Sequence, residues 1–219
     1  MESINLTVAV SESIGSVSAI AFIPGHAKAM IVLAHGAGAG MKHAFMETLC
    51  TKLSEVGIAT LRYNFPFLEN SKKRPDPPQI AEKTVAAALN KARELYPKLP
   101  VFAAGKSFGG RMSSQLLSKS PLDFVKGIVF YGFPLHAAGD PSVTRAGHLY
   151  DVHIPMLFLQ GTKDALADLS LLGPITEKIP TARLVTLEGA DHSFKAGKKD
   201  TISELVTKTE EWIGGILRS

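Results

Sequence analysis

The sequence has very little cysteine and no long apolar run. Its one cysteine, Cys50, cannot form a disulfide within the chain, and a single free thiol is typical of a reducing compartment. No stretch approaches the roughly 20 apolar residues that a membrane-spanning helix needs. The first residues have neither the basic start nor the apolar segment of a secretory signal. We therefore expect a cytoplasmic protein with no membrane partner.

The chain also lacks a concentration of charge of either sign. Its lysines and arginines exceed its aspartates and glutamates by only four, and Lys72-Lys73-Arg74 is the only run of three basic residues. Nucleic-acid-binding proteins usually gather basic residues on one element, with aromatic residues between them. We therefore expect no nucleic-acid partner.

The length and composition predict one globular domain over residues 1–219. A chain of 219 residues, 45% hydrophobic and 20% charged, fits a single α/β domain with a substantial core. No internal repeat, low-complexity tract or linker interrupts the sequence. Because little length is left for a separate cap domain, we expect loops to form the mouth of any active site.

Apolar segments alternate with amphipathic ones along most of the chain. The predicted strands are residues 4–10, 17–23, 29–34, 58–63, 100–104, 125–131, 154–160 and 182–187, and the predicted helices are 45–56, 79–96, 112–118, 166–179 and 201–217. Residues 64–78 and 132–153 are predicted loops, the second with room for a short helix. This alternation predicts an α/β fold with a mostly parallel sheet and helices on both faces. In such a sheet, ligands bind at the carboxyl ends of the strands.

One motif indicates a chemistry. Gly105-Lys106-Ser107-Phe108-Gly109 has the pattern G-x-S-x-G, and it follows an apolar run and precedes a helix pattern. A sharp strand-to-helix turn of this kind exposes the serine hydroxyl as a nucleophile at the top of a sheet. The glycines fit because the tight turn leaves no room for Cβ atoms. Ser107 is therefore the candidate nucleophile.

A serine nucleophile needs a base to take its proton and an acid to orient that base. In this type of site both follow the serine in the sequence, the acid first. Asp164 lies just past a predicted strand and is the preferred acid, with Asp140 and Asp168 as alternatives. His192 lies between the last strand and the last helix and is the preferred base. We interpret its neighbour Asp191 as a turn residue.

The oxyanion that forms on attack needs backbone N–H donors already in place. The residue after the nucleophile, Phe108, is expected to supply one N–H. The glycine-rich loop after residues 29–34 is expected to supply the other, with Ala37 as the first choice and Gly38 as the second. We interpret His35 in that loop as a structural histidine bonded to nearby backbone.

Other ligand-binding patterns are weak. A phosphate-binding loop would need glycine where Pro100 stands, and a dinucleotide fingerprint would need glycine where Met41 stands. His148 and His153, with Asp151 between them, are more typical of solvated loop histidines than of metal ligands. We expect no metal and no cofactor.

Four segments together resemble the α/β-hydrolase superfamily. They are Gly105-Lys106-Ser107-Phe108-Gly109-Gly110, His35-Gly36-Ala37-Gly38, Gly161-Thr162-Lys163-Asp164 and Asp191-His192-Ser193-Phe194. The chain is most similar to the small, capless dienelactone-hydrolase-like group, although dienelactone hydrolase itself has a cysteine nucleophile. The resemblance extends over about residues 4–217. It implies a single-domain fold with an eight-stranded sheet whose second strand is antiparallel, and it implies Ser107, Asp164 and His192 as the triad.

The sequence thus predicts a serine hydrolase that acts on a small-molecule carboxylic ester or thioester through an acyl-enzyme intermediate. The alternative is a binding or scaffold module that keeps the hydrolase fold, since a fold does not guarantee activity. Residues 62–67 and 109–112 also resemble a branch that includes relatives of a chromatin-complex subunit, in which the fold serves as a scaffold. The intact Ser107, Asp164 and His192 argue against this alternative.

Aromatic and basic residues share the loops expected at the carboxyl edge. Met41, Phe65, Phe133 and Phe194 are the predicted substrate-binding residues. The basic residues in or beside the same loops are Lys42, Lys72, Lys73, Arg74, Lys106, Lys163, Lys195 and Lys198. An apolar floor with a cationic rim would favour acyl groups that carry an anion. The alternative is a solvated surface that reflects the basic surplus of the chain.

Overall fold

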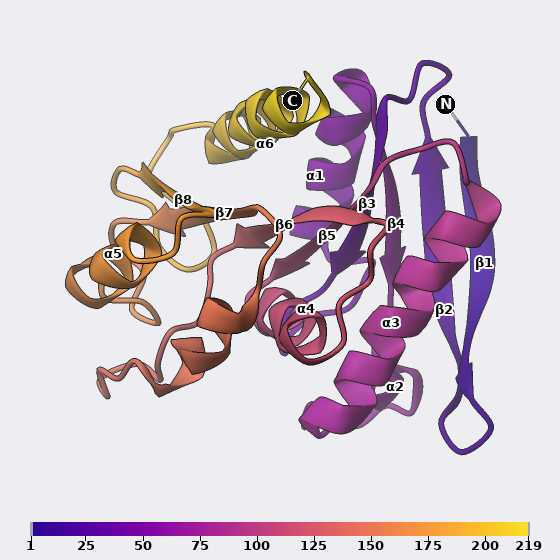
Figure 1. Cartoon of the computed structure of the whole chain (residues 1–219), viewed down its shortest axis with the longest axis horizontal. Coiled ribbons are helices and arrows are strands. Elements are labelled where there is room, and N and C mark those ends of the chain that lie inside the picture. The colour runs from indigo at the N-terminus through magenta and orange to yellow at the C-terminus, as the bar shows by residue number, and fades with distance from the viewer. Residues whose placement is uncertain (1, 219) are drawn as a thin grey trace.

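An eight-stranded sheet forms the centre of the computed structural model, which describes residues 2–218 (Figure 1). The strands are β1 (Glu2–Ser11), β2 (Gly15–Ile23), β3 (Ala29–Ala34), β4 (Ile58–Tyr63), β5 (Val101–Lys106), β6 (Val125–Tyr131), β7 (Met156–Gly161) and β8 (Ala182–Leu187), in the order β1-β2-β4-β3-β5-β6-β7-β8. Strands β3 to β8 run parallel, whereas β2 is antiparallel to both of its neighbours. The predicted sheet and its antiparallel second strand are confirmed.

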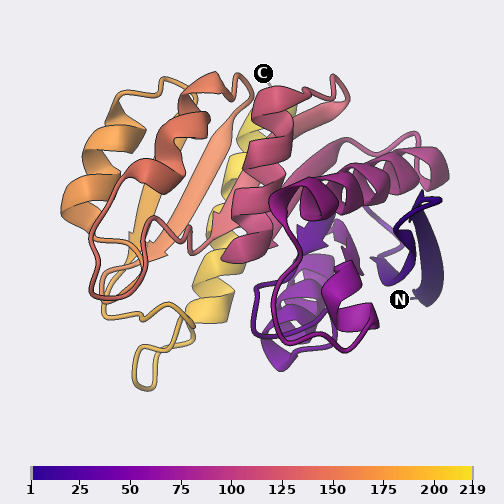
Figure 2. The same cartoon turned by 90° about the horizontal axis from the view of Figure 1, so that it is seen from below.

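Helices cover both faces of this sheet. Helices α1 (Ala44–Glu55) and α6 (Thr201–Arg218) lie on one face, and α3 (Pro78–Leu95), α4 (Phe108–Lys119) and α5 (Leu169–Glu177) lie on the other. Figure 2, seen from below, shows α3, α4 and α5 in front of the sheet and α6 behind it. No segment within residues 2–218 forms a separate cap over the sheet, as predicted. Within the same residues, no helix combines the length and the apolar character needed to cross a membrane.

The central strands are buried on both sides, which explains their continuous apolar runs. All six residues of β3 are buried. Because side chains alternate along a strand, Met30 and Val32 enter the core under α3 and α4, whereas Ile31 and Leu33 enter the core under α1 and α6. Cys50 is a free thiol buried in this second core.

Two predicted boundaries are corrected. The predicted loop 64–78 contains a short helix, α2 (Pro66–Glu69), because Pro66 stands at a first-turn position where its fixed φ favours a helix start. The predicted loop 132–153 contains the 3₁₀ helix η1 (Thr144–Asp151), in agreement with the short helix that the sequence allowed there. The helix expected from residue 166 begins at Leu169, because the Asp168 carboxylate accepts a hydrogen bond from Ser170 N–H and caps it.

Candidate active site

The loops that carry the predicted site residues meet at the carboxyl edge of the sheet. The ends of neighbouring strands lie level there, since Ala34 pairs with Gly105, Lys106 with Tyr131, and Gly161 with Leu187. Parallel strands place their following loops at one edge. The segments after β3, β5, β7 and β8 are therefore neighbours in space although they are far apart in the sequence.

Ser107 occupies a strained backbone position between β5 and α4. Its φ of 50° and ψ of −114° lie in a region that residues other than glycine seldom adopt. The surrounding glycines permit this turn. A Cβ on Gly109 would lie 2.6 Å from the carbonyl oxygen of Ala34, and a Cβ on Gly105 would collide with the backbone of Gly110. The turn has the geometry expected of a nucleophile elbow.

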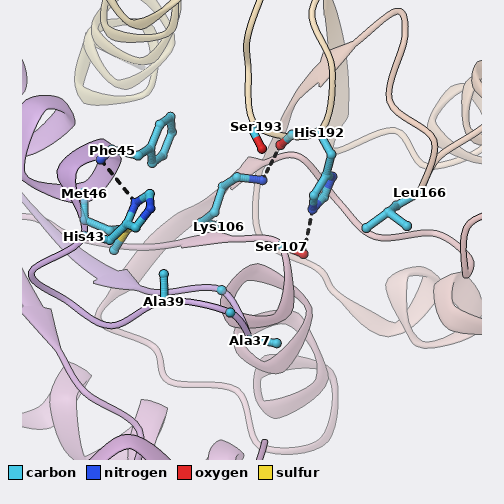
Figure 3. Close-up of a pocket in the computed structure, with 12 residues that line it drawn as sticks. Ala37, Ala39, His43, Phe45, Met46, Lys106, Ser107, Leu166, His192 and Ser193 are labelled. Atoms are coloured by element: carbon cyan, nitrogen blue, oxygen red, sulfur yellow. Dashed lines mark hydrogen bonds between the residues drawn. The ribbon is translucent and has the colours of Figure 1, made fainter. Parts of the chain in front are cut away.

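The structure brings Ser107, His192 and Asp164 into one hydrogen-bonded chain. Ser107 Oγ lies 2.9 Å from His192 Nε2, a contact that Figure 3 shows. His192 Nδ1 lies 2.7 Å from Asp164 Oδ2. Since a carboxylate can only accept, Nδ1 carries the proton, and Nε2 is left free to accept from the serine hydroxyl.

Asp164 is held by two further donors. Its side chain is 1% exposed and accepts hydrogen bonds from Gln160 Nε2 at 2.5 Å and from Leu166 N–H at 2.8 Å. Gln160 is fully buried, and its Oε1 accepts from Phe133 N–H at 2.8 Å. Gln160 is a site residue that the sequence analysis missed. The sequence feature that could have indicated it is the position of a polar amide near the end of the otherwise apolar strand β7.

The loop that carries His192 is fixed by local hydrogen bonds. Asp191 Oδ1 accepts from the N–H groups of Ser193 and Lys195, so Asp191 is the turn residue that the sequence predicted. The carbonyl of Ala190 accepts from Lys163 N–H at 2.9 Å, which joins this loop to the segment that carries Asp164. The acid and the base are therefore tied together through the backbone as well as through their side chains.

The alternative acids lie elsewhere. Asp168 is an exposed cap of α5, and its backbone N–H donates to His136 Nε2 at 2.9 Å. Asp140 is exposed in the loop before η1, where its N–H donates to the carbonyl of Ala137. Neither carboxylate contacts His192.

His35 has the structural role expected from the sequence. Its ring is fully buried; Nδ1–H donates to the carbonyl of Gly36 at 2.7 Å, and Nε2 accepts from Phe65 N–H at 3.0 Å. Burial lowers the pKa of His35 to about 4. A neutral imidazole therefore shapes the loop that precedes Ala37.

The two expected oxyanion donors lie on either side of Ser107. Ala37 lines the cavity beside Ser107, and Phe108 is the first residue of α4. In the part of the chain that the structure describes, neither N–H group donates to another protein atom. The first N–H groups of a helix have no partner within the helix and attract negative charge.

The histidines of the predicted weak metal pattern have other surroundings. His148 is half-buried rather than solvated, and its Nε2 lies 2.7 Å from Ser114 Oγ. Burial, with Arg111 and Lys119 nearby, lowers the pKa of His148 to about 4. His153 is exposed, as predicted. Within residues 2–218 no three His, Cys, Asp or Glu side chains are grouped so that they could hold a metal ion.

A cavity of about 380 Å³ opens beside Ser107 and His192 (Figure 3). Its wall consists of residues 36–39, His43, Phe45, Met46, Lys106, Ser107, Leu166, His192 and Ser193. The apolar side chains Phe45 and Met46 come from the start of α1. The sequence predicted the helix over residues 45–56 but gave no sign that Phe45 and Met46 would line the cavity.

The four predicted substrate-binding residues lie in the core instead of on this wall. Their exposed fractions are 4% for Met41, 0% for Phe65 and Phe133, and 3% for Phe194. Phe65 packs edge-on against Phe108 with ring centroids 5.2 Å apart. Phe194 stacks on Phe45, with ring centroids 5.9 Å apart. Their loops were placed correctly, but the side chains turn inward because large aromatic rings gain most from burial.

Of the predicted cationic rim, only Lys106 lines the cavity. Its Nζ donates to the carbonyl oxygen of His192 at 2.6 Å and lies 5.3 Å from the centroid of the Phe194 ring. Burial lowers the pKa of Lys106 to about 8, while Asp164 and Asp191 act in the opposite direction. Figure 3 shows its side chain reaching across the cavity wall toward the His192 loop.

Comparisons with known proteins agree with this architecture. The structure is similar to a dienelactone hydrolase from Anabaena variabilis, with a TM-score of 0.79 and 20% identity over 98% of this chain and 97% of that chain. It is also similar to an α/β serine hydrolase without a lid from Xanthomonas campestris, with a TM-score of 0.72 and 19% identity over 100% of this chain and 94% of that one. At these identities the similarity shows the fold. A model of the family described as an alpha/beta hydrolase domain matches residues 27–213, and the chain therefore belongs to the α/β-hydrolase domain family.

Proposed function

We propose that the chain is a serine-dependent hydrolase of carboxylic esters or thioesters. The observation that carries the proposal is the hydrogen-bonded chain from Ser107 through His192 to Asp164, with distances of 2.9 and 2.7 Å. Ser107 and His192 lie in the wall of a cavity that a small substrate can enter. Membership of a hydrolase family and similarity to a lidless serine hydrolase support the same class of reaction.

In the first half of the reaction, Ser107 Oγ attacks the substrate carbonyl while His192 Nε2 takes the serine proton. The Asp164 carboxylate stabilises the resulting imidazolium through the Nδ1–H bond. The N–H groups of Ala37 and Phe108 stabilise the negative oxygen of the tetrahedral intermediate, and the N-terminus of α4 adds its dipole. The intermediate then expels the alcohol or thiol, which receives the proton from His192.

The second half returns the enzyme to its starting state. The acyl group is now bonded to Ser107 Oγ. Water attacks this ester while His192 again acts as the base, and the acid leaves as Ser107 recovers its proton. The protein supplies every group that these steps require. The binding-module alternative is less well supported, because a scaffold would not need a serine, an imidazole and a carboxylate in bonding contact.

The experiment is a comparison of Ser107→Ala with Ser118→Ala on p-nitrophenyl esters of graded chain length. Ser118 lies on the same helix, and its hydroxyl donates to the carbonyl of Gln115, away from the cavity. Loss of the nucleophile should lower kcat by a factor of about 10³ or more, whereas Ser118→Ala should keep the wild-type rate. A fluorophosphonate probe should label the wild-type protein and Ser118→Ala only. Turnover that survives in Ser107→Ala would contradict the proposal.

A further inference from the structure

The cavity wall contains a lysine that the proposed mechanism does not use. Among residues 2–218, Lys106 is the only lysine or arginine in this wall, and no aspartate or glutamate lines it. As the residue before Ser107, Lys106 is carried by the same strained turn as the nucleophile. The cavity therefore presents one positive charge close to the reacting atoms.

The ammonium group of Lys106 has unused hydrogen-bonding capacity. An ammonium has three N–H donors, and in the described residues only the carbonyl oxygen of His192 accepts from Nζ. The two carboxylates that act on it from a distance are engaged elsewhere. Asp164 accepts from His192, and Asp191 accepts from two backbone N–H groups of its own turn. Within residues 2–218, no carboxylate forms an ion pair with Lys106.

The position of this charge is fixed. The bond to the His192 carbonyl and the Phe194 ring hold Nζ from two sides. Gly132 leaves room for the ammonium group, since a side chain there would place its Cβ 3.2 Å from Nζ. A half-buried cation that is fixed in place and has no anionic partner interacts strongly with an anion that enters the cavity, because little ordering and little further dehydration are required.

We propose that Lys106 binds an anionic group of the substrate, so that the preferred esters or thioesters carry a carboxylate near the scissile bond. This inference rests on the proposed function of Ser107. The apolar wall formed by Phe45 and Met46 contacts the carbon chain, and the ammonium of Lys106 contacts the carboxylate. The carboxylate can belong to the acyl group or to the leaving group, since both portions pass Ser107.

Two pairs of matched esters test this inference. In the first pair the acyl group differs: p-nitrophenyl hemisuccinate carries a carboxylate, and p-nitrophenyl methyl succinate is its neutral counterpart. In the second pair the leaving group differs: 4-acetoxybenzoate is compared with its methyl ester. We expect the wild-type kcat/KM to favour the anionic member of one pair by a factor of about 10 to 100, and that pair identifies which portion Lys106 contacts.

The variants are Lys106→Met and Lys195→Met. Both remove one positive charge, but Lys195 is exposed on the His192 loop and does not line the cavity. Lys106→Met should lose the preference for the anionic ester, whereas Lys195→Met should keep it. In the wild type the preference should decline as the pH rises through about 8, because Lys106 then loses its charge despite the nearby Asp164 and Asp191.

Several outcomes would overturn the inference. The wild type could show no preference in either pair, or Lys106→Met could slow both members of a pair equally, which would make Lys106 only a support of the His192 loop. A binding assay separates this failure from failure of the proposed function. Ser107→Ala should bind monomethyl succinate at least about tenfold more tightly than dimethyl succinate, and adding Lys106→Met should remove the difference. This readout does not depend on turnover.

Discussion

At the residue scale, the site depends on polar side chains that each form hydrogen bonds to two partners. Gln160 is the clearest example, because its amide donates to Asp164 and its carbonyl oxygen accepts from Phe133 N–H. The amide group thus connects the segment after β6 to the carboxylate that orients His192. Gln160 does not touch the reacting atoms, and we regard it as a positioning residue.

Replacing Gln160 with leucine should therefore affect both stability and activity. The change leaves a buried N–H on Phe133 without a partner and removes one donor from Asp164, which should destabilise the fold by about 2 to 4 kcal/mol. We expect kcat to fall by a factor of about ten, because Asp164 keeps its bonds to Leu166 and His192. Urea unfolding and p-nitrophenyl ester assays measure the two effects.

Gln115→Leu is the matched control for this change. Gln115 is half-buried on α4, and its Oε1 has no hydrogen-bond partner. Removing an unsatisfied oxygen should be neutral or slightly stabilising, and it should leave kcat unchanged. Equal effects of the two substitutions would show that Gln160 has no special connection to Asp164.

The sequence could identify Ser107, Asp164 and His192 because each follows a strand that a short apolar run predicts. It could not identify Gln160 or the bond from Lys106 to the His192 carbonyl, because these depend on which loops meet across the sheet. For the same reason it placed Met41 and Phe133 in the correct loops but could not give the direction of their side chains. The position of a residue in a loop follows from the local sequence, whereas the direction of its side chain depends on packing against distant parts of the chain.

At the element scale, the contact between α4 and β3 determines the position of Ser107. Gly109 and Gly110 let the first turn of α4 approach the strands closely, since a Cβ on Gly109 would lie 2.6 Å from both the Cβ and the carbonyl oxygen of Ala34. A backbone carbonyl cannot move aside without shifting β3. The glycines after the serine thus set the distance between two elements as well as the conformation of the turn.

Gly109→Ala should therefore displace α4 and Ser107 together. We expect a loss of about 2 kcal/mol or more in the free energy of unfolding, as for other overpacking changes. Because small displacements of reacting groups are costly, we also expect a fall of about 100-fold in kcat. Urea unfolding and fluorophosphonate labelling of Ser107 report the two effects separately.

Gly215 provides the opposite case within α6. A Cβ on Gly215 would have no heavy atom within 4 Å apart from its chain neighbours and its own helix, and alanine is the better helix former. Gly215→Ala should stabilise the protein by about 0.5 to 1 kcal/mol without changing kcat. If both substitutions proved neutral, close packing of α4 on β3 would not be what positions the serine.

The ends of the helices could not be predicted from the spacing of apolar residues alone. The prolines of residues 64–78 indicated a loop, yet Pro66 starts α2 because proline suits the first turn of a helix. Helix α4 begins at Phe108, four residues before its apolar pattern was recognised, because glycines dominate its first turn. Patterns of apolar residues predict the middle of a helix, whereas its ends depend on capping residues, prolines and glycines.

At the scale of the whole molecule, two buried cores lie on opposite faces of one sheet. Two buried histidines connect loops at the edge of this sheet to neighbouring segments. His35 links the loop after β3 to the segment after β4 through Gly36 and Phe65. His136 does the same near α5, where it bonds Ala137 and Asp168. In His35 one ring nitrogen donates and the other accepts, so the arrangement of the loops around it requires a neutral imidazole.

The stability of the protein should consequently fall in mild acid. The pKa of His35 is about 4 in the folded state and about 6.5 in the unfolded chain. Between these values the unfolded chain binds a proton that the folded protein does not, so the free energy of unfolding decreases as the pH falls from about 6.5 to about 4. For the fully buried His35 the loss should reach about 3 kcal/mol. Half-buried His148, whose pKa is also about 4, should add to it in the same direction.

His35→Asn tests this origin of the acid sensitivity. Asparagine keeps a donor for the carbonyl of Gly36 but cannot be protonated in this range, and it loses the bond from Phe65 N–H. The variant should therefore be less stable than the wild type at pH 7.5, and the difference should narrow as the pH approaches 4. Urea unfolding at pH 7.5, 6, 5 and 4.5 gives both curves. Parallel curves would mean that protonation of His35 does not lower the free energy of unfolding in mild acid, and that the loop beside Ser107 tolerates a charged imidazole.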